Sequence, residues 1–346
     1  MKTYFENKLL GFFVKTNGYF SKKIFSGIGH IVTFHRVLSE SNFSIPENKA
    51  LEITPEFLER LIHFYTNHDY EFASLDILYE ILHNRLKKNK KIVVFTFDDG
   101  YSDVYDTVYP LLQKYNVPLN LYITSSFPDN SAILWWYLVD DLIRNKDSVC
   151  FVFKGKNIRF NCKTGIEKQE VFNYFRDLII SNYNEYLFIL NDIFSQNGID
   201  IYGRSKAYAL NWEQIKEMSR NPLVCIGAHT VNHPIFSKLT ENEISDEILN
   251  SKAIIEKHIN KEVNHFAYPY GGSDEVGERE FKILKKLSFK TCTTTRYSNI
   301  FKGHRNHLEC LPRVHIRESS TNEKLENLIS GITQYSKNSF KRIITV

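Results

Sequence analysis

Long apolar runs without polar alternation constrain the fold of this chain more than any other feature. The clearest is KIVVFTF at residues 91–97. A continuous run of this kind suits a strand buried on both faces, as in a parallel sheet covered by helices. Amphipathic helical patterns separate the runs, so the chain alternates strand and helix. Similar runs lie at residues 30–35, 118–124, 223–228, 264–268, 291–295 and 311–316. The pattern predicts an α/β fold, either a parallel barrel or an open doubly wound sheet.

One stretch interrupts this alternation. Residues 138–204 combine a short strand pair with helical patterns rich in Tyr, Phe and Asn, which we interpret as a mostly helical insertion. The expected organisation is an N-terminal helical segment (1–29), a main domain in two pieces (30–137 and 205–317), the insertion, and a C-terminal helix and tail (318–346).

Composition narrows the classes of function and the compartment. The 346 residues include 44 Lys and Arg against 40 Asp and Glu, a net charge of +4. This bias is too weak to indicate a nucleic-acid partner. Five cysteines without C-x-x-C spacing favour free thiols in a reducing compartment over disulfides or a structural zinc site. We therefore expect a cytoplasmic protein.

The N-terminal segment leaves two interpretations open. It carries no run of roughly 18 apolar residues and no pattern of a cleaved secretory signal. Its lysines alternate with Leu and Phe, so residues 1–29 form either a helix packed on the protein or a helix lying on a membrane surface. The second interpretation implies peripheral membrane association.

Polar side chains follow the apolar runs at the points where strands should end. Asp98 and Asp99 follow one run directly, and His229 and His233 follow another. Because the carboxyl ends of parallel strands meet at one edge of the sheet, these side chains are expected to gather there. Two imidazoles and one carboxylate form an open metal site, and the second carboxylate can serve as a general base. A divalent cation also explains why two adjacent acidic residues are tolerated at a buried strand end.

Three motifs carry a resemblance to a known family. In order they are T-F-D-D-G (96–100), H-T-x-x-H (229–233) and Y-P-Y-G (268–271). Together they resemble the polysaccharide deacetylases of carbohydrate esterase family 4, which include the nodulation-type chitooligosaccharide deacetylases. The resemblance covers roughly residues 30–137 and 205–317, so that the main domain would be the catalytic domain. It implies a distorted, incomplete (β/α) barrel.

The resemblance also implies roles for single residues. Asp98 would be the general base, while Asp99, His229 and His233 would bind a divalent metal ion. The metal in such enzymes is usually zinc, sometimes cobalt, nickel or iron. Thr230 would support the loop between the histidines. The backbone N–H of Tyr270 would help to hold the oxyanion.

The chain departs from the family pattern in two places. Ala267 stands where an arginine that pairs with the base is usual, and we take Arg313 in LPRVHI as the replacement. The usual C-terminal L-x-H histidine is also absent. Members similar to biofilm poly-N-acetylglucosamine deacetylases take this histidine from an N-terminal strand, so His35 in T-F-H-R is the predicted general acid. The rival candidates are His304, His307 and His315.

The expected reaction is metal-dependent removal of an N-acetyl group from an amino sugar, in a surface polysaccharide or its lipid-linked precursor, with release of acetate. The alternatives are a related deacylase or amide hydrolase with a non-sugar substrate, and an inactive glycan-binding module. Trp135 and Trp136 are candidates for the wall of a sugar groove, whereas core packing is preferred for Trp212. No oligomeric state is predicted.

Overall fold

Eight parallel strands form the central sheet of the protein. The computed structural model describes residues 24–40, 43–339 and 341–345, so most of the predicted N-terminal segment, with its membrane-surface alternative, lies outside the described residues. Every pairing within this sheet is parallel. The strands run in the order β11 (Thr291–Thr293), β10 (His265–Ala267), β9 (Val224–Ala228), β6 (Leu119–Ile123), β5 (Lys91–Phe97), β1 (Gly29–Phe34) and β12 (Val314–His315), with β4 (Tyr70–Phe72) also paired to β5.

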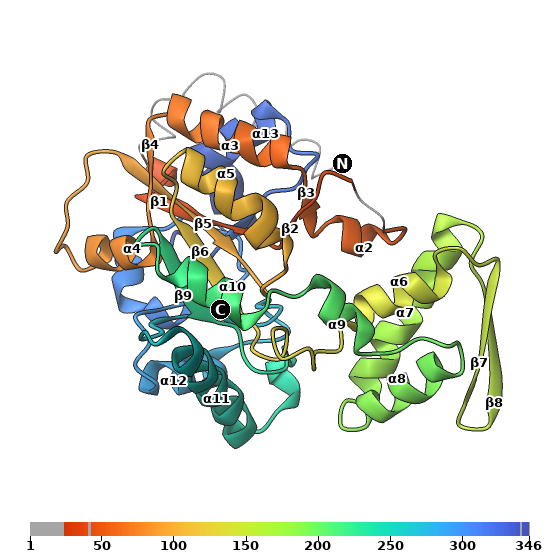
Figure 1. Cartoon of the computed structure of the whole chain (residues 1–346). Coiled ribbons are helices and arrows are strands. Elements are labelled where there is room, and N and C mark those ends of the chain that lie inside the picture. Colours follow the sequence, from red (N-terminus) through yellow and green to blue (C-terminus); the bar gives the residue numbers. More distant parts are fainter. Residues whose placement is uncertain (1–23, 41–42, 340, 346) are drawn as a thin grey trace.

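The sheet curls until its two edges are joined by one segment of chain. Val314 pairs with Val32 of β1, while Leu311, three residues earlier, bridges to Thr293 of β11. The Leu311 N–H donates to the Cys292 carbonyl at 2.8 Å. The edges are joined by this short segment and not by a full-length strand. The fold is therefore a distorted, incomplete (β/α) barrel, as the resemblance implied (Figure 1).

Helices cover the outside of the barrel, and local sequence explains where several of them begin. The Thr54 hydroxyl accepts from the Phe57 N–H before α3, and Pro55 occupies the first helical position. Thr240 and Glu243 form the predicted capping box of α11. The covering helices are α3 (Pro55–Asn67), α4 (Leu75–Leu82), α5 (Tyr109–Lys114), α10 (Trp212–Ser219), α11 (Glu241–Ile259), α12 (Glu278–Lys286), α13 (Asn322–Ser330) and α14 (Ile332–Lys337).

One covering helix begins irregularly. A π-helical turn, Val104–Val108, precedes α5, and the Tyr109 N–H reaches back to the Val104 carbonyl. Pro110, the next residue, has no N–H to donate, which relaxes the ordinary α-helical pattern at this point. The turn starts shortly after Asp99 and adjusts how the chain leaves the end of β5.

The insertion has a hydrophobic cluster of its own. Its core side chains, among them Leu142, Phe175 and Phe194, pack together apart from the barrel core. The predicted boundary at residue 138 falls inside α6, so the division into segments stays a prediction. The elements are α6 (Trp135–Ile143), the antiparallel pair β7 (Ser148–Phe153) and β8 (Lys156–Asn161), α7 (Gly165–Ser181), α8 (Tyr186–Ser195) and α9 (Gly203–Tyr208). Figure 1 shows them grouped on one side of the barrel.

A short segment after β1 ties the insertion to the barrel. It contains β2 (Arg36–Val37), α2 (Pro46–Lys49) and β3 (Glu52–Ile53). The buried Asp140 carboxylate of α6 accepts from the Ser44 N–H, the Ser44 hydroxyl and the Ile45 N–H, at 2.8–3.0 Å. The Asn48 side chain donates to the Trp136 carbonyl at 2.9 Å. These bonds fix the start of α6 beside the barrel opening.

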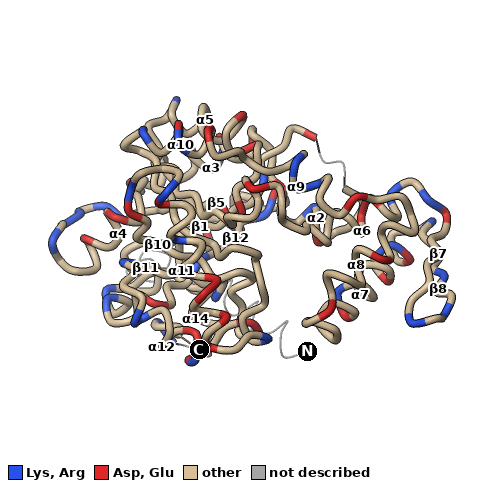
Figure 2. Tube along the Cα trace, turned by 60° about the horizontal axis from the view of Figure 1, so that its bottom comes forward, with Lys and Arg blue, Asp and Glu red and all other residues tan. Residues whose placement is uncertain are grey.

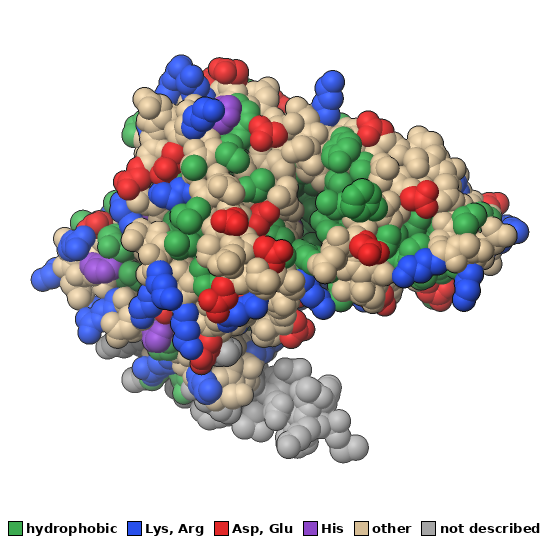
Figure 3. Space-filling view, turned by 90° about the horizontal axis from the view of Figure 1, so that it is seen from below, with side chains coloured by type: hydrophobic (Ala, Val, Ile, Leu, Met, Phe, Trp, Pro, Cys, Tyr) green, Lys and Arg blue, Asp and Glu red, His purple; other side chains and the backbone are tan. Residues whose placement is uncertain are grey.

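The surface shows no division of charge between barrel and insertion. Basic and acidic residues are interspersed along both parts of the trace (Figure 2). Hydrophobic side chains gather where the insertion borders the hollow between it and the barrel (Figure 3). Among the described residues, the helices are all too short or too polar to cross a membrane.

Candidate active site

A cavity of about 310 Å³ opens at the carboxyl ends of the strands, between the barrel and the insertion. Its barrel side carries the residues that the sequence proposed for catalysis and metal binding: His35, Asp98, Asp99, His229, His233, Tyr270 and Arg313. They meet because β5 ends at Phe97, β9 ends at Ala228 and β1 ends at Phe34, each immediately or shortly before a polar side chain. Asp98, Asp99, His229 and His233 therefore lie together at the carboxyl ends of the strands, where the sequence predicted them.

The adjacent carboxylates Asp98 and Asp99 face different partners because the backbone turns sharply between them. Asp99 has φ 74° and Gly100 has φ 98°, both in the left-handed region. A side chain at Gly100 would be strained there, and its Cβ would lie 3.1 Å from Ile123. The turn separates two charges that would otherwise repel each other at one strand end.

Asp99 lies between the two histidines. Its Oδ1 atom is 3.4 Å from His229 Nε2 and 3.5 Å from His233 Nε2. The three donor atoms lie within 4.8 Å of one another, and this oxygen is buried without a hydrogen-bond partner among the described residues. One carboxylate and two imidazoles are a donor set that zinc and similar ions accept. The residues present therefore fit a divalent metal ion.

Electrostatics within this group follow from burial and close contact. Burial would raise the pKa of Asp99, but the adjacent imidazoles of His229, His233 and His35 hold it well below its usual value. Burial lowers the pKa of His233 to about 4, which keeps this imidazole neutral at pH 7. His229 donates its Nδ1 proton to the Ala267 carbonyl at 2.7 Å, so its Nε2 lone pair is available to an ion beside Asp99.

Asp98 pairs with Arg313 in a buried two-point contact. Arg313 Nη1 and Nη2 lie 2.7 and 2.8 Å from the two carboxylate oxygens, and Arg313 is 1% exposed. Arg313 also donates to the Thr294 carbonyl and to the Thr96 hydroxyl. Burial would raise the pKa of Asp98, but Arg313 outweighs it and lowers the value. The guanidinium thus occupies the place proposed for the missing arginine.

His35 is distinguished from its rivals by position. It lines the cavity with Asp98 and Asp99, whereas His315 lies behind it, with the two rings 6.3 Å apart. His304 belongs to a short helix that packs against α4, near Ile300, which pairs with the first residue of β1. His304, and His307 just after it, therefore lie toward the opposite end of the strand that leads to His35.

Tyr270 stands at a tight turn beside the metal candidates. It has φ 59°, and its ring lies 4.8 Å from that of His233. The following Gly271 donates to the Pro269 carbonyl at 2.6 Å. No acceptor among the described residues takes the Tyr270 N–H, which leaves this donor free for a ligand.

The outer wall of the cavity comes from segments that carry no motif. Trp135 and Trp136 line it, and Trp135 stacks on Phe172 at 5.2 Å. Trp212 does not line the cavity: its ring stacks on His258 at 4.0 Å. Sequence reasoning missed several lining residues because they come from α2, the insertion and a loop, where no pattern marks them: Glu47, Asn48, Leu51, Phe172, Arg176 and Thr295.

Comparison with known proteins agrees with this geometry. The chain is 19% identical over 252 residues to the curated Bacillus subtilis protein YxkH, named as a polysaccharide deacetylase; the match covers 73% of this chain and 62% of the relative. The Streptococcus pyogenes deacetylase PplD, solved with acetate, has a similar fold, with a TM-score of 0.58, 20% identity and coverage of 87% and 97% of the two chains.

A de-N-acetylase from Aggregatibacter actinomycetemcomitans has a similar fold as well, with a TM-score of 0.55, 16% identity and coverage of 86% and 98%. The family model described as polysaccharide deacetylase matches residues 85–151 and 172–291, more than half of the chain. This match includes the Asp98–Asp99 pair and both histidines of the Asp99 group. The chain belongs to the polysaccharide deacetylase family.

Proposed function

We propose that the protein hydrolyses the N-acetyl group of an amino sugar, in a surface polysaccharide or its precursor, with the help of a divalent metal ion. The observation that carries this proposal is that two adjacent carboxylates in one cavity contact different partners. Asp99 faces two histidines, while Asp98 is paired with a buried arginine. Such a pair separates metal binding from proton transfer.

Asp99, His229 and His233 would hold the ion. When bound, it supplies Lewis-acid polarisation of the amide carbonyl and lowers the pKa of a water molecule. Zinc is the expected ion because two neutral imidazoles and one carboxylate suit it, and cobalt, nickel and iron accept the same donors. The open side of the group faces the cavity, where water and substrate have room.

Asp98 is proposed as the general base. Arg313 keeps it ionised by lowering its pKa, and the two-point contact fixes the plane of the carboxylate. A charged, oriented carboxylate can accept the proton of the attacking water. The free N–H of Tyr270 is proposed to stabilise the negative charge that develops on the substrate oxygen.

His35 is proposed as the general acid. The nitrogen of an amide departs poorly as an anion, so it must receive a proton as the C–N bond breaks. His35 lines the same cavity as Asp98 and comes from the neighbouring strand.

The aromatic wall supports a sugar substrate. Trp135 and Phe172 present stacked rings beside the proposed metal group, and sugar rings pack well on such surfaces. An N-acetyl group as the reacting part of the substrate is supported by two proteins of similar fold. One is a de-N-acetylase, and the other is a deacetylase solved with acetate. Acetate and a free amine would be the products.

The test measures bound metal and acetate release together. The purified protein is loaded with zinc and given a panel of N-acetylated glycans and simple N-acetyl amides. Asp98→Asn should retain one zinc ion yet lose turnover, whereas His229→Ala should lose the ion as well. Equal metal content in the two variants would contradict the assigned roles, and bound glycan without acetate release would identify a binding module instead.

A further inference from the structure

The two histidines beside Asp99 are held in different ways. His229 donates its second ring nitrogen to the Ala267 carbonyl. His233 Nδ1 is buried but has no hydrogen-bond partner among the described residues. A histidine that binds a metal is normally oriented by a hydrogen bond at its other nitrogen. The orientation of His233 therefore depends on what packs around it.

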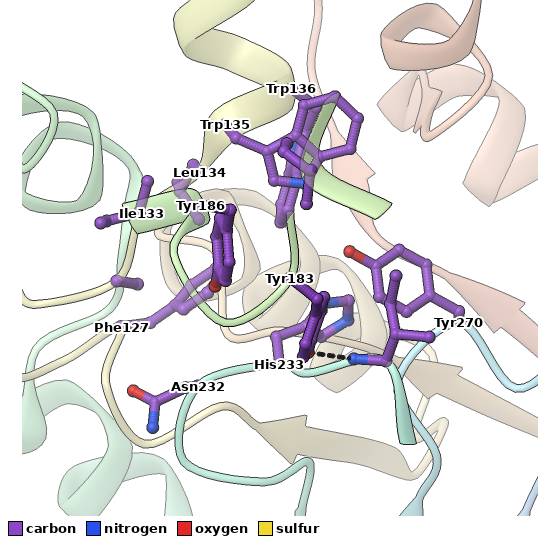
Figure 4. A pocket seen from close by; sticks show the side chains of 13 residues that line it. Phe127, Ile133, Leu134, Trp135, Trp136, Tyr183, Tyr186, Asn232, His233 and Tyr270 are labelled. Carbon is purple, nitrogen blue, oxygen red and sulfur yellow. Dashed lines mark hydrogen bonds between the residues drawn. The ribbon is translucent and has the colours of Figure 1, made fainter. Parts of the chain in front are cut away.

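Aromatic rings from both parts of the molecule enclose His233. Trp136 of α6 lies 5.9 Å from its ring, and Tyr270 of the barrel lies 4.8 Å away. The cavity behind these side chains is only about 20 Å³, room for one water molecule at most. On this side the imidazole has little space in which to rotate (Figure 4).

The backbone beside His233 is tied to the insertion as well. Tyr183, between α7 and α8, accepts a hydrogen bond at its hydroxyl from the Ile235 N–H, at 2.8 Å (Figure 4). Ile235 lies two residues after His233, which itself has φ 54°, in the left-handed region. A loop with this conformation needs outside contacts to stay in place.

We propose that the insertion is a positioning element for His233, with Tyr183 holding the loop and Trp136 holding the ring. The inference rests on the proposed metal role of His233. It gives the insertion a function distinct from lining the substrate cavity: it sets how long the metal ion is retained. Tyr183 does not line the substrate cavity, and Trp136 is not among the donor residues of the Asp99 group, so the role proposed for both is to position His233.

The experiment compares Tyr183→Phe with Tyr186→Phe. Both tyrosines line the small cavity and their rings are stacked, 5.5 Å apart, but only Tyr183 bonds to the loop. Each full-length variant is loaded with zinc, and release of zinc to a chelator is timed. We expect release about 10-fold faster in Tyr183→Phe, as for other residues that orient metal ligands, and unchanged release in Tyr186→Phe.

A second readout separates positioning from general stability. The visible spectrum of the cobalt-loaded protein reports ligand geometry, and it should change in Tyr183→Phe and in Trp136→Phe but not in Tyr186→Phe. Zinc release at the wild-type rate with an unchanged spectrum in both Tyr183→Phe and Trp136→Phe would overturn the inference alone. A wild-type protein that binds no ion would overturn the proposed function together with it.

Discussion

Two groups of side chains with metal-ligand chemistry lie at opposite ends of the same parallel sheet. Asp99, His229 and His233 follow the carboxyl ends of β5 and β9. A second group joins Cys225, near the start of β9, to His265, the first residue of β10, and to Asp76 of α4. In each group the donor atoms lie within 4.8 Å of one another.

The two groups differ in how far other residues of the protein already neutralise the charge of their donor atoms. Asp76 Oδ1 accepts a hydrogen bond from the Lys290 ammonium at 2.7 Å, and its side chain is half exposed. Burial raises the pKa of the Cys225 thiol to about 12, so forming a thiolate there is costly. Asp99, by contrast, is buried and faces two imidazoles beside a cavity. Closeness of donors alone does not indicate a metal site; we propose one at Asp99 because its buried charge has no fixed cation beside it.

The largest expected effect is on metal content. Asp99→Asn should lose the bound zinc ion, and acetate release should fall by roughly 10³-fold or more, because the carboxylate ligand is gone. Asp76→Asn should keep both. Zinc per chain, measured by atomic absorption on dialysed protein, checks this. If the protein binds a second ion that is lost in Asp76→Asn, the Asp76 group also binds metal, and the proposed difference between the two groups is wrong.

The next effect is on stability without metal. Arg313→Ala leaves Asp98 as an unpaired buried charge, so the free energy of unfolding should fall by about 3–5 kcal/mol. Lys290→Ala removes a partly exposed partner of Asp76 and should cost less than about 1 kcal/mol. Urea unfolding in the presence of a chelator measures both. Similar losses in the two variants would mean that burial does not separate the two carboxylates.

A smaller effect is expected on substrate binding, since the aromatic wall stands only at the Asp99 end. Trp135→Leu should raise KM by up to about 10-fold, the loss of one stacking contact, with little change in kcat. Trp212→Leu, outside the cavity, is the matched control and should change KM less than twofold. Steady-state kinetics on an N-acetylated oligosaccharide decide the matter. An unaltered KM in Trp135→Leu would remove the wall from the substrate site.

The smallest effect is a pH dependence at the Asp76 end. The adjacent His265 and the hydrogen bond from Lys290 lower the pKa of Asp76 below its usual value, while burial opposes them. A carboxylate with a lowered pKa in the folded state stabilises the protein above its unfolded pKa of about 3.9 and loses this contribution at lower pH. Wild type should exceed Asp76→Asn in stability at pH 6, by less than about 1 kcal/mol, and the difference should shrink below pH 4. Urea unfolding across pH 2–7 checks it; a constant difference contradicts the ion pair.

Much of the fold could be predicted because parallel strands leave a plain pattern. The run at 91–97 is apolar except for Lys91 and Thr96, since β5 is covered on both faces. The capping box of α11 marks the start of that helix. The gathering of Asp98, Asp99, His229 and His233 followed from strand ends meeting at one edge. Arg313 was predicted as the replacement for an arginine that the family resemblance implies, and its side chain contacts Asp98.

Other features could not be predicted because no local pattern encodes them. His229 is oriented by the backbone carbonyl of Ala267, and any residue type would offer the same atom. The contact of Tyr183 with Ile235 joins residues 52 positions apart. The start of α6 at Trp135 was missed because its cap is tertiary: Leu134 makes no side-chain capping bond, and the helix is fixed instead through Asp140 and Asn48. Long-range contacts decide such details.

The segment at residues 311–315 has a consequence for how the protein matures. It bridges the two edges of the sheet and also carries the guanidinium that neutralises Asp98. A ribosome must therefore synthesise the chain beyond residue 313 before the proposed base acquires its counter-charge. A chain that ends before residue 311 would leave the two edges of the sheet unjoined and Asp98 without its guanidinium partner. Both defects are expected to make such a chain a target of cellular quality control.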